Sequence, residues 1–456
     1  MRRVVKVSRI RIIITIIVVV LTTLLTGCTG KEPNEIAYVV ALGIDSTDDD
    51  NYKITIQYAN TTQISGGASE SGGKAGSEIV DNVTIEAPNI YAGVGLANNI
   101  VSKSFSMSHA KLIVFSKEIA EKGVKDMIET LVRSEEIRPD VFIAVANTPA
   151  NDYLTSVNPE MEVNPAQYYQ LIYQKNQLVG IPDGQLREFF TGLYTDNYDS
   201  ILPVAGVIEG SGGNSQNDDK GQSKDGQNEG SEGSSESLDS FESKSSNEKD
   251  ENEKEKDAEK NTSKYEYDIK NYVGGETAIE KKNKAEAIGA AVFEKDKMVG
   301  ELGEVETEIC KMLKGDYTYS YLTYYNNDTP DIPITVKTTQ QKKPKYKIDT
   351  DKKTVDIELY IESDLYSLPA DYNVENKIED FERDVANYTS SACTEFINNF
   401  TKKYNSDILK LNEKIKYKFL TNNQYNWFKK NVGWSEYKFS VCTNFKVRRT
   451  GLIVRE

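Results

Sequence analysis

The residues with the clearest chemistry lie near the amino terminus, where Leu25, Thr26 and Gly27 precede Cys28. An apolar residue, two small residues and a cysteine form the pattern that directs lipid attachment in exported bacterial proteins. The thiol would take a diacylglyceryl group, and the small neighbours would admit the peptidase that cuts before the cysteine. The pattern therefore predicts Cys28 as an acylated residue at the start of the mature chain.

The segment before Cys28 has the composition of an export signal. Five basic residues stand among the first eleven, and a largely apolar run follows over residues 12–25. The run is shorter than the roughly 20 residues that a spanning helix needs. Residues 1–27 are therefore predicted to be a cleaved signal peptide. An uncleaved anchor helix is the alternative, and both interpretations place the rest of the chain outside the cytoplasm beside a membrane.

Few other residues suggest chemistry. His109 is the only histidine, so a zinc site with several histidine ligands cannot be built, and a Ser-His-Asp set would depend on it. We interpret His109 as a hydrogen-bonding residue at the start of a strand. An acidic hairpin tip accounts for residues 48–50 better than a cation site does. The sequence also lacks phosphate-loop, dinucleotide and paired-cysteine metal motifs, and we predict no catalytic, metal or cofactor-binding residues.

Three cysteines remain besides Cys28, namely Cys310, Cys393 and Cys442. An odd, widely spaced set gives no disulfide framework. Cys393 falls on the apolar stripe of a predicted helix, and Cys442 falls in a predicted strand. We expect both to be buried as small hydrophobic side chains.

The charge of the chain limits its partners. The 456 residues carry a formal net charge of −16, and removal of the basic signal segment would make the remainder more acidic. An acidic surface repels nucleic acid and anionic headgroups, so nucleic acid is excluded as a partner and lipid must hold the protein at the membrane. One acyl chain binds only weakly, and a diacylated cysteine meets the need for a second.

Residues 28–34 are predicted to be a tether, and residues 35–208 an amino-terminal region of one or two subdomains. The nearly continuous apolar run at 36–44 indicates a buried strand, and the alternation at 52–58 indicates a half-buried partner in a hairpin. Further strands are predicted at 83–87, 112–115, 141–146 and 201–208, and helices from 88, at 117–132 and within 150–196. The order strand, helix, strand over 112–146 favours a crossover onto a mixed sheet.

Residues 209–264 form an acidic, Gly/Ser-rich segment in which Phe241 is the only aromatic residue. Such a composition cannot bury enough apolar surface to offset its conformational entropy, so disorder is predicted. The segment is interpreted as a solvated insertion between two folded regions, with a charged recognition segment as the alternative.

Residues 265–456 are predicted to be a carboxy-terminal domain. A long amphipathic helix is expected at 373–404, because apolar residues recur there every three or four positions. So long a helix should pack across a sheet. The other predicted elements are a hairpin at 287–293 and 298–302, a helix at 307–313, and strands at 317–325, 332–338, 345–349, 355–361 and 437–447.

Short motifs along the chain match one known family. The most specific is the hairpin in which Ala290-Ala291-Val292-Phe293 precedes Lys295-Asp296-Lys297-Met298-Val299-Gly300-Glu301-Leu302. The other motifs are Glu35-Ile36 with Gly43-Ile44-Asp45, Ser108-His109 with residues 111–115 and the helix that follows, Ser406-Asp407-Ile408-Leu409, and Val447-Arg448-Arg449-Thr450-Gly451. On these residues the chain resembles the Ger(x)C family of spore germination proteins, over nearly all of the mature sequence outside the insertion.

The chain departs from the family pattern in three places. Thr29-Gly30 stands where the family often has tryptophan, and Lys410-Leu411-Asn412 replaces a glycine-containing step. The insertion is unusually long, which leaves its role open.

The resemblance implies an α+β fold of about three small domains, with mixed sheets flanked by helices and no enzymatic site. It implies a lipoprotein subunit of a nutrient germinant receptor, held by its acyl anchor on the outer face of the spore inner membrane. The implied partners are integral-membrane receptor subunits. A solute-binding lipoprotein of an importer is the alternative function, and an envelope hydrolase using paired carboxylates is a further one.

Overall fold

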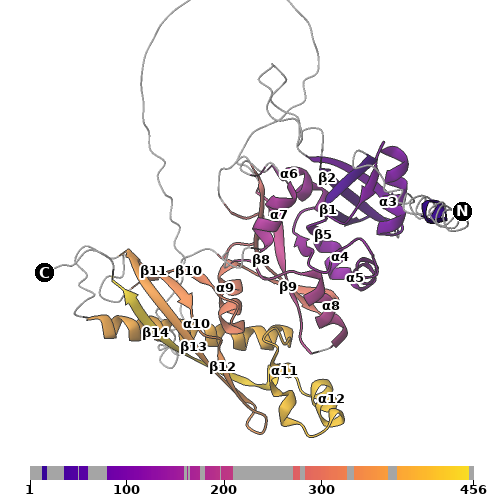
Figure 1. Cartoon of the computed structure of the whole chain (residues 1–456). Coiled ribbons are helices and arrows are strands. Elements are labelled where there is room, and N and C mark those ends of the chain that lie inside the picture. Colours follow the sequence, from indigo (N-terminus) through magenta and orange to yellow (C-terminus); the bar gives the residue numbers. More distant parts are fainter. Residues whose placement is uncertain are drawn as a thin grey trace, which may run out of the picture. The chain divides into compact units, whose positions relative to one another are not determined.

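The computed structural model describes two mixed sheets and the helices that cover them (Figure 1). The described residues are 13–17, 35–49, 51–59, 80–158, 162, 165–174, 180–195, 197–208, 271–277, 283–325, 333–367 and 377–450. The predicted lipid-attachment motif at 25–28, the tether at 29–34 and the disordered insertion at 209–264 lie outside them. Within this described part, no helix has both the length and the apolarity that crossing a membrane requires.

The first sheet has nine strands in the described residues, with the order β3-β2-β1-β5-β6-β7-β8-β9 and β4 paired to β1. The strands are β1 (Ile36–Ser46), β2 (Tyr52–Ala59), β3 (Val80–Ala87), β4 (Ser104–Ser106), β5 (Leu112–Ser116), β6 (Phe142–Ala146), β7 (Ile201–Val207), β8 (Ala285–Glu294) and β9 (Lys297–Leu302). Neighbours from β1 to β7 pair in parallel, whereas β2, β3, β8 and β9 pair antiparallel. The predicted hairpins β1–β2 and β8–β9 are confirmed.

The parallel pair β5–β6 confirms the predicted crossover pattern, but the helix between these strands is broken. The expected helix at 117–132 is two helices, α4 (Lys117–Lys122) and α5 (Lys125–Val132). Gly123 separates them with a φ of 123°, a backbone conformation that residues with a Cβ atom rarely adopt. The break lets both short helices pack their apolar sides on the sheet.

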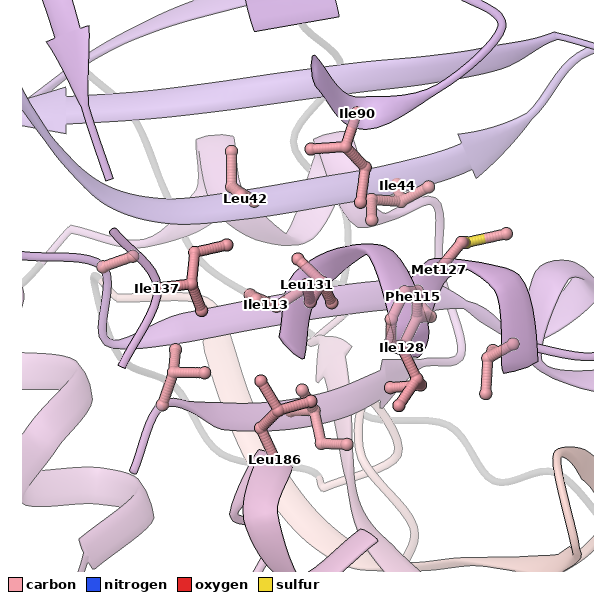
Figure 2. Close-up of a cluster of buried hydrophobic side chains, with 14 of the residues drawn as sticks. Leu42, Ile44, Ile90, Ile113, Phe115, Met127, Ile128, Leu131, Ile137 and Leu186 are labelled. Atoms are coloured by element: carbon pink, nitrogen blue, oxygen red, sulfur yellow. The ribbon is translucent and has the colours of Figure 1, made fainter. Parts of the chain in front are cut away.

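One face of the first sheet packs against α3 (Ile90–Ile100), α4, α5 and α8 (Leu186–Thr195). Figure 2 shows this core, where Ile113 and Phe115 of β5 meet Ile128 and Leu131 of α5. Apolar burial on this scale is the main favourable term in folding.

The opposite face is also covered, by α6 (Ala150–Ser156) and α7 (Pro165–Gln174). The prediction of a half-buried β2 was therefore wrong at its centre, where Thr55 and Gln57 are fully buried. Gln57 donates from Nε2 to the Leu154 carbonyl at 2.9 Å and accepts from the Tyr169 hydroxyl at 2.6 Å. These bonds offset the cost of burying an amide.

Strands β7 and β8 pair antiparallel, although residues 208–284 separate them in the sequence. The first sheet therefore takes strands from both regions that were predicted on either side of the insertion. The division into domains at that point stays a prediction about folding units.

The second sheet has five strands in the described residues: β10 (Tyr319–Tyr325), β11 (Pro333–Gln340), β12 (Lys345–Asp349), β13 (Thr354–Ser367) and β14 (Lys438–Arg449). Strand β13 pairs antiparallel with β11 and β12 and in parallel with β14. The long helix α10 (Ile378–Tyr404) packs on β14, as its apolar stripe predicted. The α+β class with mixed sheets and a long carboxy-terminal helix is confirmed.

Strands β13 and β14 alternate between buried and exposed residues. Cys393 of α10 is buried, as expected, but Cys442 of β14 is exposed, so the prediction for Cys442 was wrong. Its neighbours Val441 and Thr443 point into the core, and the two-residue period of a strand sends Cys442 to the other face.

Candidate functional site

The predicted lipid-attachment residues Leu25, Thr26, Gly27 and Cys28 lie outside the described residues, and their role stays a prediction. His109 is exposed just before β5. Its Nδ1 lies 3.0 Å from the Ser108 hydroxyl, and its ring meets the Tyr38 ring edge-on at 4.7 Å. These contacts agree with a structural role at the start of a strand.

Asp48 and Asp49 lie in the turn between β1 and β2. The Thr47 hydroxyl donates to the carbonyl groups of Asp49 and Asn51, both at 2.9 Å, so the turn is closed by its own hydrogen bonds. In the described ranges, no group of three or more His, Cys, Asp or Glu side chains could hold a metal ion.

A different place brings charged side chains together: the contact between the first and second sheets. Two cavities adjoin there and share Tyr198, Asp199 and Ser200 as wall residues. The first has a volume of about 430 Å³ and is lined by residues within 182–202 and 311–318 and by Lys410. The second, of about 620 Å³, is lined by residues within 192–200 and 405–434 and by Lys295. We call this place the inter-sheet joint.

Asp199 and Asp407 tie the joint together. The Asp407 N–H donates to Asp199 Oδ2 at 2.9 Å, and the Asp199 N–H donates to the Asp407 carbonyl at 3.2 Å. The Asp407 carboxylate also accepts from the N–H groups of Leu411 and Asn412 at 2.7 and 2.8 Å. It thereby satisfies donors at the start of α11 (Leu411–Ile415) that have no partner within the helix.

Asp407 is almost fully buried at 4% exposure. Burial raises the pKa of its carboxyl to about 7, against the opposing effect of the two N–H donors and with a further contribution from the Asp199 charge. A carboxyl group with this pKa changes its charge near neutral pH. The joint therefore carries a proton-sensitive group at the point where the two sheets are linked.

Lys410 explains one departure from the family pattern. It adopts a φ of 57°, in the left-handed region that favours glycine. Its ammonium lies 3.1 Å from Glu188 Oε2 and 4.1 Å from the centre of the Tyr198 ring. Lysine thus supplies an ion pair and a cation–π contact in exchange for backbone strain of about 1 kcal/mol.

Glu188 and Tyr198 complete this group on the side of the first sheet. The Tyr198 hydroxyl donates to the Glu188 carbonyl at 3.0 Å. Burial acts to raise the pKa of the Glu188 carboxyl, but the hydrogen bond and charge of Lys410 outweigh it and lower that pKa. Glu188 therefore stays ionised opposite Lys410.

Helix α9 (Glu304–Lys314) forms the other wall of the first cavity. Lys311 is 5% exposed and donates from Nζ to the Ile181 carbonyl at 3.0 Å. Burial lowers the pKa of Lys311 to about 8. Burial raises the pKa of Asp183, on the opposite wall. The cavity presents charges of both signs, a pattern suited to polar or zwitterionic groups.

The lining of the joint combines lysines and carboxyl groups with aromatic and apolar side chains. Among the described residues that line the two cavities there is no histidine and no cysteine. The carboxyl groups present are engaged by backbone N–H groups or by lysine. The arrangement can hold two sheets together and respond to protonation.

Comparison with known proteins assigns the family. The model of the spore germination protein N-terminal domain matches residues 30–207, and the spore germination B3/GerAC-like C-terminal model matches residues 288–451. The chain belongs to the Ger(x)C family of spore germination proteins. The two matches flank the insertion and cover both sheets.

Several curated proteins are similar to this family member. Spore germination protein KC of Bacillus subtilis is 27% identical over 35% of this chain and 42% of its own length. The putative spore germination protein YfkR of the same organism is 28% identical over 32% and 37%. Spore germination protein GerQC of Bacillus cereus is 27% identical over 23% and 29%. The chain thus aligns with less than half the length of each of these relatives.

A solved structure is also similar. The crystal structure of the GerBC protein matches with a TM-score of 0.47 and 15% identity, over 89% of this chain and 96% of that one.

Only part of the joint could be predicted from the sequence. The motif Ser406-Asp407-Ile408-Leu409 supported the family resemblance, and the structure shows Asp407 at the centre of the joint. Glu188, Tyr198 and Asp199 gave no sequence signal, because the contacts that join them to Asp407 and Lys410 span more than 200 positions.

Proposed function

We propose that this Ger(x)C protein is a non-catalytic, lipid-anchored subunit of a spore nutrient germinant receptor. The observation that carries the proposal is the order of features on one chain: a Leu-Thr-Gly-Cys motif, then both family regions. The motif supplies an attachment point for lipid, and the family regions supply the link to germination.

The proposed mechanism is positional. Acyl chains on Cys28 hold the protein on the outer face of the spore inner membrane, and the folded regions contact integral-membrane receptor subunits. The inter-sheet joint supports an adaptor role, because polar groups from both sides meet there around two cavities, beside the buried apolar cluster that contains Val292 of β8 and Ile357 of β13.

Deletion of the gene tests the receptor role. Spores without this chain should fail to respond to at least one nutrient, when assayed in a strain that lacks redundant receptors. A copy of the wild-type chain should restore the response. Normal germination of the deletion strain with every nutrient tested would contradict the proposal.

Replacement of the lipid-attachment residue tests the anchor. Cys28→Ala should abolish labelling of the protein with palmitate and release it from the membrane fraction, while its folded part stays intact. Cys442→Ala is the matched control, because that thiol is exposed on β14 and should leave labelling unchanged. A Cys28→Ala protein that stays with the membrane and supports germination would show that protein contacts hold it there.

The alternative, a solute-binding lipoprotein of an importer, has one observation in its favour. The cavity of about 430 Å³ at the joint has lysine and carboxylate groups on its walls, and a zwitterionic nutrient could pair with both. Titration calorimetry of the full chain with single amino acids tests this function. Measurable heat that disappears in Lys410→Gln would favour it over the adaptor role.

A further inference from the structure

The segment after α11 exposes an unusual amount of apolar surface. Tyr417, in the short helix η3 (Lys416–Lys418), is 81% exposed, and the nearby Leu420 is 94% exposed. Trp427 of α12 (Asn422–Asn431) is 64% exposed. Single exposed apolar residues are normal, but three large ones within eleven positions indicate a surface that binds something. We call residues 416–430 the lysine–aromatic surface.

These side chains are exposed although the backbone that carries them is well packed. The Phe419 ring lies 5.7 Å from the ring of Tyr425 and 5.0 Å from that of Phe428. The Thr421 hydroxyl accepts from the Gln424 N–H at 3.3 Å and begins α12. Inward-facing aromatic residues thus pack between η3 and α12. This packing keeps the side chains of Tyr417, Leu420 and Trp427 exposed to solvent.

The charge of this part of the chain is opposite to that of the whole. Residues 410–438 contain seven lysines and two glutamates, whereas the chain has a net charge of −16. Lys416, Lys418 and Lys430 are exposed among the apolar side chains. A local excess of positive charge attracts anionic surfaces even when the whole protein is acidic.

We propose that the lysine–aromatic surface binds directly to an anionic phospholipid bilayer. Tyrosine and tryptophan favour the headgroup region, where a ring can contact acyl chains while its polar atom stays hydrated. Lysines on the same segment pair with anionic headgroups, and leucine adds apolar area. A protein partner fits less well, because lysine is depleted from protein interfaces while aromatic residues are enriched there.

The surface gives the carboxy-terminal part of the chain its own contact with the membrane. The inference does not rest on acylation of Cys28, since its residues lie in the second family region. With an amino-terminal anchor it would fix the protein at two points and set which side faces the bilayer.

The two tryptophans of the chain allow a direct test, because Trp427 is exposed whereas Trp434 is 4% exposed. The full chain is bound to vesicles whose lipids carry bromine on the acyl chains, and the fluorescence of Trp427→Phe is subtracted from that of the wild type. With brominated vesicles that contain phosphatidylglycerol, the Trp427 signal should fall by about half. Vesicles of brominated phosphatidylcholine alone should leave it nearly unchanged.

Charge variants make the test specific. Lys416→Gln with Lys430→Gln should abolish most of the quenching. Lys122→Gln with Lys125→Gln removes the same charge from α4 and α5 on the first sheet and should keep it. Co-sedimentation reports total vesicle binding separately, so a failed amino-terminal anchor is distinguished from a failed surface. Unquenched Trp427 on anionic vesicles would overturn the proposal. Equal quenching on both kinds of vesicle, or shielding of Trp427 only when receptor subunits are added, would also overturn it.

Discussion

The two sheets differ in how many of their faces are covered by helices. In the first sheet, β5 and β6 are buried along their whole length, because helices cover both faces. In the second sheet, β13 and β14 alternate, because α10 covers one face and the other meets water. When helices cover both faces of a parallel sheet, neither face is exposed to water. When a helix covers only one face, the other face stays exposed and polar. The comparison predicts where this chain tolerates change.

The same contrast places the functional surfaces. The first sheet leaves little of its central strands exposed. The inter-sheet joint, the exposed thiol of Cys442 and the lysine–aromatic surface all involve the second sheet or the helices after α10. The second sheet and the helices after α10 therefore carry the surfaces proposed above for contacts.

The largest difference is expected for a charge placed in a central strand. Val114→Lys buries an ammonium where both faces of β5 are covered and should cost more than about 4 kcal/mol of unfolding free energy. Cys442→Lys places the same group on the outer face of β14, opposite Glu358, and should change stability by less than about 0.5 kcal/mol. Urea unfolding of both variants measures the difference. Similar losses in the two would refute the contrast between the sheets.

A smaller but still large effect is expected beneath α10. Phe381 is fully buried, with its ring 6.2 Å from that of Tyr324 and 6.5 Å from that of Phe445. Phe381→Ala should cost about 3–5 kcal/mol, because it removes contacts and leaves a cavity. Glu395→Ala, on the exposed side of the same helix, should cost less than about 0.5 kcal/mol. Calorimetric melting of the two variants tests whether the single covered face carries the stability of the second sheet.

The joint should respond less strongly than either core. Asp407→Ala leaves the Leu411 and Asn412 N–H groups without their acceptor and should cost about 2 kcal/mol. Hydrogen exchange should quicken at residues 405–415 in this variant. Asp199→Ala, which removes the acceptor of the Asp407 N–H, should quicken exchange at 197–200 and at 405–408 together. Asp351→Ala, in the exposed turn before β13, is the control. Faster exchange on only one side would show that the sheets are not coupled through this contact.

The smallest effect depends on pH. Burial raises the pKa of Glu308 from 4.5 to about 7, although bonds from Ser320 and Tyr317 act to lower it. The folded state therefore binds the proton of the Glu308 carboxyl more tightly than the unfolded state does. The stability that this proton contributes is present below pH 4.5 and is lost as the pH rises toward 7. Glu308→Gln should remove that loss and be more stable than the wild type at pH 8. A stability difference between Glu308→Gln and the wild type that stays the same from pH 4 to pH 8 in melting experiments would contradict this prediction.

Much of the secondary structure could be predicted, because it depends on local pattern. The alternation of β13 and the stripe of α10 reflect repeats of about two and 3.6 residues, and β1 is marked by a nearly continuous apolar run. The break at Gly123, the parallel pairing of β13 with β14 and the burial of Gln57 could not be predicted. Each depends on which distant segment lies alongside, and local sequence does not encode that choice.

The sequence by itself determined the α+β class, most of the strands and helices, the resemblance to the Ger(x)C family, and the lipid-attachment motif as a hypothesis. Only the tertiary structure decided that Asp199 meets Asp407 across 208 positions, that Cys442 faces outward, and that Tyr417, Leu420 and Trp427 share an exposed, lysine-rich segment. The physical reason is that periodicity fixes which residues share a side of one element, whereas exposure and pairing depend on the elements packed against it.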